Sequence, residues 1–124
     1  MPSYRLNVAV KTRHIPEQSD ASEKRFVFAY TITITNAGDI PTQVIARHWI
    51  ITDADAHVEE VKGLGVVGHQ PLLAPGQAFE YTSGTALATA TGSMRGSYFC
   101  VAEDGHRFDA TIDEFSLSVP RSLH

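Results

Sequence analysis

The chain has 124 residues, of which 43% are hydrophobic and 19% are charged, and its formal net charge is −4. This length suits one domain, and the composition is that of a globular protein, which excludes wholesale disorder. A mildly acidic chain lacks the clustered positive charge that general nucleic-acid binding needs, so no nucleic-acid partner is expected.

Alternating side chains begin near the N-terminus, where residues 6–10 predict a half-buried β-strand. A polar loop is expected at residues 16–24. The clearest strand follows at residues 26–35, where Phe28 and Ile32 share one face with other aromatic and β-branched residues. This face is predicted to lie in the core.

The next strand is predicted at residues 44–52, followed by a turn at residues 53–56 and a short strand at residues 57–62. Both faces of the first segment carry apolar residues, so we expect it to be covered in part on both sides. Trp49 is expected in the core, as in many β-sandwiches, with Arg47 solvated beside it.

A long irregular stretch of residues 63–76 and a small-residue loop of residues 85–92 are expected in the second half of the chain. The remaining strands are predicted at residues 77–83, 93–103 and 107–118. The last two flank Asp104-Gly105, a strong signal for a β-hairpin.

The chain therefore predicts seven or eight strands at a spacing of roughly ten residues, which is typical of an all-β sandwich or barrel. We expect a single domain over residues 1–124, with an ordered sandwich at residues 3–120 and a tail at residues 121–124. Exposed edge strands can pair between chains, which leaves a homodimer open.

The single cysteine, Cys100, excludes an intrachain disulfide and suits a reducing compartment. The N-terminus lacks the apolar segment of a signal peptide, and no stretch approaches the roughly 18 apolar residues of a membrane span. A cytoplasmic protein without membrane contact is the expectation. Cys100 is expected to be a small core residue, because no neighbouring base is placed to make it a nucleophile.

The segment Gly63–Gly68 matches the pattern G-x-G-x-x-G of dinucleotide-binding folds. Pro71 and Pro75 would break the helix which that fold places after the motif, so a dinucleotide site is not expected. Two interpretations stay open. The glycines either satisfy special backbone angles, or their amides form an anion-binding nest. The candidate anion- or partner-binding residues are Gly63, Gly65, Gly68 and His69.

An acidic turn at Asp53, Asp55 and His57 could place three side chains on one side, but a solvated turn is the favoured interpretation. The calcium-loop pattern fails because Val58 and Leu64 stand where it requires Gly and Glu. No catalytic residue, metal site or cofactor is predicted.

Arg47 and His48 form a candidate interaction surface, since arginine is enriched at interface hot spots. The alternative is that Trp49 is buried and its neighbours are only solvated.

Several blocks, in order and at the right spacing, resemble the ApaG family, also called CorD. The blocks are residues 26–34, residues 47–53, residues 63–68, Pro75-Gly76 with residues 81–84, and residues 92–98. The resemblance covers residues 4–120. Two positions depart from it, because Ala56 stands where the family usually has a turn glycine and His69 where a charged residue is common.

The resemblance implies a fibronectin type III-like or immunoglobulin-like sandwich. It also implies a genetic link to cobalt and magnesium handling, without an established biochemical activity. Related domains in F-box proteins and in a protein that interacts with DNA polymerase delta imply a non-enzymatic protein-protein interaction module with an unidentified protein partner. The alternative function is a small-ligand binder that takes a phosphate compound or a divalent cation at the glycine-rich loop.

Overall fold

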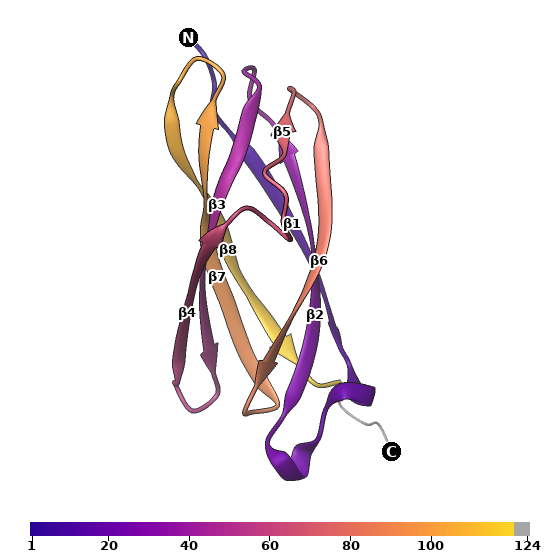
Figure 1. Ribbon diagram of the computed structural model, residues 1–124. Coiled ribbons are helices and arrows are strands. Elements are labelled where there is room, and N and C mark those ends of the chain that lie inside the picture. The colour runs from indigo at the N-terminus through magenta and orange to yellow at the C-terminus, as the bar shows by residue number, and fades with distance from the viewer. Residues whose placement is uncertain (121–124) are drawn as a thin grey trace.

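Two antiparallel sheets pack face to face in the computed structural model, which describes residues 1–120 (Figure 1). The strands are β1 (Leu6–His14), β2 (Phe26–Asn36), β3 (Thr42–Asp53), β4 (Val58–Leu64), β5 (Leu72–Leu73), β6 (Ala78–Leu87), β7 (Thr91–Ala102) and β8 (Arg107–Ser118). Two short 3-10 helices, η1 (Pro16–Gln18) and η2 (Ala21–Glu23), lie in the expected polar loop. The predicted all-β sandwich is confirmed, and the predicted tail at residues 121–124 lies outside the described residues.

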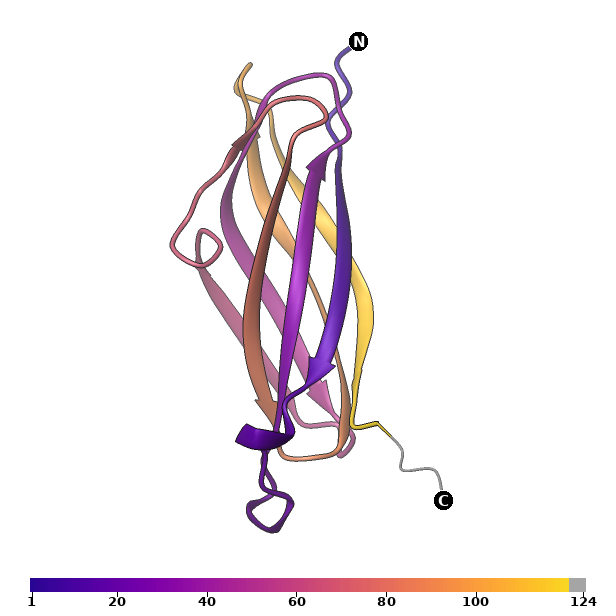
Figure 2. The same cartoon turned by 90° about the vertical axis from the view of Figure 1, so that its right-hand side faces the viewer.

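The smaller sheet has the strand order β1-β2-β6 and stands in front of the larger one in Figure 2. The larger sheet has the order β4-β3-β7-β8, and β5 pairs with one end of β3. β1 and β8 contact each other along one side of the sandwich. On the other side, β4 and β6 are the free edges of the two sheets.

The core lies between the sheets and is filled by alternate residues of each long strand. In β2 the predicted face is confirmed, since Phe28 and Ile32 are 1% and 0% exposed. Trp49 of β3 is also buried, as expected, and its ring meets the rings of Tyr30 and Phe115 edge-on. Such aromatic contacts fix the packing of one sheet on the other.

A β-bulge interrupts the alternation predicted for β3. Val44 pairs with Cys100 and Ala46 pairs with Phe99, so Ile45 is an extra residue in the ladder. The extra residue reverses the alternation. Val44 and Trp49 are therefore both buried although they are five positions apart, and the outward residues of β3 are half-buried, in line with the expected partial covering of both faces.

Several strands run further than the sequence predicts. β1 continues to His14 and β4 to Leu64, so two residues of the glycine motif are in a strand. β6 continues to Leu87, which was expected in a loop. The reason is that residues 85–87 pair with residues 26–28 of β2, whose partner contacts override the low strand propensity of small residues.

Within residues 1–120, no helix is both long and apolar enough to cross a membrane.

Candidate functional site

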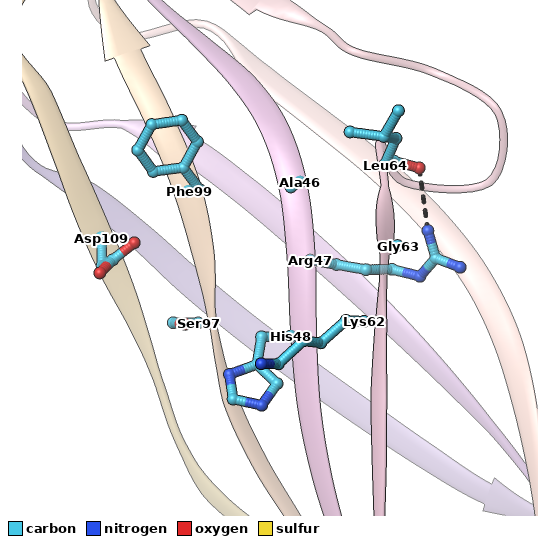
Figure 3. A pocket seen from close by; sticks show the side chains of 9 residues that line it. All are labelled: Ala46, Arg47, His48, Lys62, Gly63, Leu64, Ser97, Phe99 and Asp109. Atoms are coloured by element: carbon cyan, nitrogen blue, oxygen red, sulfur yellow. Dashed lines mark hydrogen bonds between the residues drawn. The ribbon is translucent and has the colours of Figure 1, made fainter.

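A hollow of about 470 Å³ lies on the outer face of the larger sheet, away from the core. Its lining combines both groups of candidate residues, because Arg47 and His48 meet Gly63 there (Figure 3). The other lining residues are Ala46, Lys62, Leu64, Ser97, Phe99 and Asp109. We refer to these nine residues as the outer hollow.

Strand register creates the shape of the outer hollow. Ala46 pairs with Leu64 on one side and with Phe99 on the other, so a small side chain lies between two large ones. His48 likewise pairs with Lys62 and with Ser97. Cross-strand neighbours on one face are about 5 Å apart, so the short side chains of Ala46 and Ser97 leave a depression.

The outer hollow has an apolar wall and a charged rim. Leu64 is 76% exposed, an unusual degree for a large apolar side chain in a strand. Charges of both signs surround it, with Lys62 on β4 and Asp109 on β8. An apolar centre with a polar rim is the common arrangement of a protein–protein interface.

Glu60 links two residues of this rim. His48 Nε2 lies 2.9 Å from Glu60 Oε1, and Lys62 Nζ lies 3.3 Å from the same oxygen. Hydrogen bonds from Lys62 first, and then from His48, hold the pKa of the Glu60 carboxyl below its usual value. The Glu60 carboxylate therefore holds the side chains of His48 and Lys62 in place beside the outer hollow.

Arg47 is half-buried and is held by the backbone, whereas the prediction was a solvated side chain. Its Nη1 donates hydrogen bonds to the carbonyl oxygens of Leu64, at 2.9 Å, and of Gly65, at 3.1 Å. The guanidinium lies directly against Gly63, where a Cβ atom would come within 2.7 Å of Arg47 Cζ. A methyl group at Gly63 would therefore displace the Arg47 guanidinium from this position.

Arg47 and His48 both line the outer hollow, but their side chains reach different partners. His48 reaches Glu60 on the outer face, whereas Arg47 reaches the end of β4 and also lines a second depression between the sheets. Adjacent residues of a strand point to opposite faces, which explains the separation.

The glycine-rich segment after β4 forms a tight turn. Val66 and His69 exchange two backbone hydrogen bonds, and Val67 and Gly68 between them have φ angles of 49° and 78°. Positive φ at both central residues is typical of a type I′ turn. Val66 is fully buried and anchors the turn to the core.

Most of the turn's backbone donors are engaged within the protein. The amide of Gly65 donates to Ile45, and the amides of Val66 and His69 donate to each other's carbonyls. The His69 ring packs against Phe79, with centroids 5.6 Å apart. This geometry favours the structural interpretation of the glycines, and ligand binding at Gly63, Gly65, Gly68 and His69 stays a prediction.

The acidic turn is organised by its own backbone. Asp53 Oδ1 accepts hydrogen bonds from the amides of Asp55 and His57, both at 2.9 Å. Within residues 1–120, no group of three or more His, Cys, Asp or Glu side chains is placed to hold a metal ion.

Cys100 is a core residue, as predicted. It is fully buried, and burial raises the pKa of its thiol to about 12. Because the thiolate is the reactive form, this thiol is poorly suited to nucleophilic chemistry.

Sequence reasoning missed the row formed by Leu64, Ala46 and Phe99. The three residues come from separate strands, and only the register brings them together. If the predicted strand at residues 57–62 had been extended into the glycine motif, the alternation of its side chains would have placed Leu64 on the outer face.

Comparison with known proteins now places the chain in a family. Residues 16–102 match the family described as the ApaG domain. The chain belongs to the ApaG family.

Relatives within the ApaG family match the chain over nearly its full length. Protein ApaG of Ralstonia nicotianae is 62% identical over 124 residues and covers 100% of both chains. Protein ApaG of Thiobacillus denitrificans is 62% identical over 121 residues, which are 98% of this chain and 95% of the relative. A crystal structure of the putative ApaA protein from Bordetella pertussis has a TM-score of 0.93 at 60% identity, covering 96% of this chain and 97% of that one.

Proposed function

We propose that this protein is a non-enzymatic protein–protein interaction module of the cytoplasm, and that its partner docks on the outer hollow. The observation that carries the proposal is the exposed Leu64 beside Ala46 and Phe99, within a rim of charged residues. Burying Leu64 and Phe99 against a partner would remove apolar surface from water, while His48, Lys62 and Asp109 would orient the partner.

The rigid setting of these residues supports the proposal. Leu64 lies on β4 and Phe99 on β7, which are the strands on either side of β3. Arg47 fixes the end of β4 through two hydrogen bonds. A pre-ordered surface loses little conformational entropy when a partner binds.

The link to cobalt and magnesium handling is assigned in this proposal to the partner. Asp53, which the sequence places in the acidic turn, already accepts two amide hydrogen bonds within that turn. An effect on metal handling would then depend on which protein is bound.

The test is affinity capture with the full chain from an extract of cells that express it. Three baits are compared: the unaltered chain, Leu64→Asp, and the control Ala9→Asp. Ala9 is an exposed apolar residue on β1 in the other sheet, so its variant adds the same charge away from the outer hollow. Thermal melting of each bait confirms that it is folded.

The proposal expects a reproducible partner that the unaltered chain and Ala9→Asp both retain. Leu64→Asp should recover at most about one-tenth of the partner protein that the unaltered chain recovers, because an unpaired charge buried in the interface opposes docking. Recovery of no reproducible partner, or equal recovery by Leu64→Asp, would count against the proposal.

A further inference from the structure

The second depression, which we call the edge groove, lies between the free edges of the two sheets. It has a volume of about 420 Å³ and is bounded by β3 and β4 on one side and β6 on the other. A smaller depression of about 210 Å³ shares Ile51, Glu59 and Ala86 with it, so the two lie next to each other beside β6. Arg47 is the one residue that lines both the edge groove and the outer hollow.

β6 is an unguarded strand edge. Natural edge strands commonly carry charges, prolines or bulges that prevent another chain from pairing with them. Among the other edge strands of residues 1–120, β1 carries Lys11 and Arg13, and β4 carries Glu59, Glu60 and Lys62. β8 carries four charged residues, which are Arg107, Asp109, Asp113 and Glu114.

β6 differs from those edges. Its one charged residue, Glu80, lies near its start, and the seven residues from Tyr81 to Leu87 are uncharged. Its pairing with β2 is continuous, without a bulge. This edge therefore presents regular, unpaired backbone groups to any extended chain that approaches it.

The edge groove supplies side-chain contacts for such a chain. Buried rings of Tyr30 and Trp49 line it, and Ser83 and Thr85 of β6 form its polar wall. Alternate side chains of an added strand would point into the groove, since strand side chains alternate between faces.

Two charged residues line the groove, Glu59 and Arg47. They lie at different positions along it, since Glu59 is paired with Ile51 and Arg47 with Gly63. Arg47 gives its own end of the groove a chemical preference. Only its Nη1 is engaged with the Leu64 and Gly65 carbonyls, and Nε and Nη2 carry the remaining N–H groups. Figure 3 shows the second terminal nitrogen pointing away from the Leu64 carbonyl. A guanidinium beside aromatic rings pairs best with a carboxylate, which it can bind through two parallel hydrogen bonds.

We propose that β6 binds an extended peptide segment of a partner protein as an added strand, and that a carboxylate of this peptide enters the edge groove and pairs with Arg47. The backbone of β6 provides affinity for any extended chain. Arg47 selects an acidic residue or a chain terminus at one register position. This site lies on a different side of β3 from the outer hollow and shares only Arg47 with it.

The probe is an array of ten-residue peptides of random sequence, made with either amidated or free C-termini. The 124-residue chain is applied to this array and its binding to each peptide is measured. The peptide that binds most tightly is then made again with its carboxylate replaced by an amide. The two kinds of C-terminus distinguish an acidic side chain from a terminal carboxylate.

Two protein variants accompany the probe. Ala86→Glu places a negative charge on the rim of the edge groove, where it would repel a carboxylate, and Ala9→Glu places the same charge on β1 as a control. Both original residues are exposed, and melting curves verify that the variants are folded. Backbone amide shifts of the unaltered protein with the peptide map the site without any substitution.

The proposal expects Ala86→Glu and the amide-for-carboxylate exchange each to weaken binding by about tenfold or more, while Ala9→Glu binds as the unaltered chain does. Amide shifts should centre on residues 81–87. The proposal is overturned if no peptide binds, if the shifts centre on the outer hollow, or if both changes leave binding intact. It is also overturned if sedimentation shows a dimer that Ala86→Glu dissociates, because a second copy then occupies β6.

Discussion

Ala56 has a backbone conformation that is unfavourable for a residue with a side chain. Its φ angle is 64°, in the left-handed region that favours glycine, and it closes the turn between β3 and β4. The resemblance to the ApaG family singles out the same position as one where glycine is usual. The turn has kept its shape because Asp53 accepts hydrogen bonds from within it.

Ala56→Gly should therefore stabilise the protein by up to about 1 kcal/mol, since relief of left-handed strain exceeds the added entropy of the unfolded chain. Urea unfolding measures the change. Ala54→Gly is the matched control, because Ala54 lies in the same turn without a positive φ. Equal effects of the two substitutions would contradict this account.

Tyr81 and Tyr98 join the two sheets by a hydrogen bond between their hydroxyl groups in the core. Tyr98 is fully buried and Tyr81 is 8% exposed, so each hydroxyl has little access to water. A buried hydroxyl that loses its partner keeps its desolvation cost.

Tyr98→Phe should lower the free energy of unfolding by about 1–2 kcal/mol, because it leaves the Tyr81 hydroxyl unpaired. The double variant Tyr81→Phe/Tyr98→Phe should cost less than the sum of the two single variants. A double-mutant cycle in urea checks this. Strict additivity would show that the two hydroxyls do not stabilise each other.

At the scale of the elements, the close approach of β3 and β7 depends on Gly96. A Cβ atom there would collide with the carbonyl oxygen of His48, whereas one at Gly84 of β6 would meet Phe28 O at an ordinary 3.4 Å. Gly96 also lies where the β7–β8 register shifts, between Met94 and Gly96. The larger sheet can form its β3-β7 ladder only with glycine here.

Gly96→Ala should destabilise the protein by about 2–3 kcal/mol, because the backbone of β3 or β7 must move to admit the methyl group. Gly84→Ala is the control, and it should be neutral or slightly stabilising. Thermal unfolding of both variants measures the difference. Equal stability of the two variants would refute the assigned clash.

At the scale of the whole molecule, buried groups that lose protons at high pH make the fold sensitive to alkali. Burial raises the pKa of Cys100 from 9.0 to about 12 and that of Tyr81 from 10.0 to about 12. Burial also raises the pKa of Tyr98. Between the unfolded and folded values, the unfolded chain has released protons that the folded chain retains.

Stability should therefore not change on account of these groups below about pH 9, and it should fall as the pH rises from about 9 to 12. Each group can contribute up to about 1.4 kcal/mol per pH unit in this window. Urea unfolding at a series of alkaline pH values measures the slope. Cys100→Ala should reduce the slope just above pH 9, and an unchanged slope would contradict the assignment.

Side-chain alternation and turn residues along the sequence were sufficient to predict most of the strands. The alternation in residues 26–35 identified the inner face of β2, and Asp104-Gly105 identified the β7–β8 hairpin. Both signals depend on neighbouring residues only, so the sequence displays them directly. The burial of Trp49 and of Cys100 followed from the same patterns.

The sequence by itself determined the strand period, the two-sheet class and the family, because alternation and ordered motifs are properties of the chain. The tertiary structure alone decided the face-reversing bulge at Ile45, the engagement of Arg47 by the end of β4, and the length of β6. It also decided the outer hollow and the edge groove, since both are built from strands that only their hydrogen-bond register brings side by side. Register between distant strands depends on how the whole core packs, and no local segment encodes that.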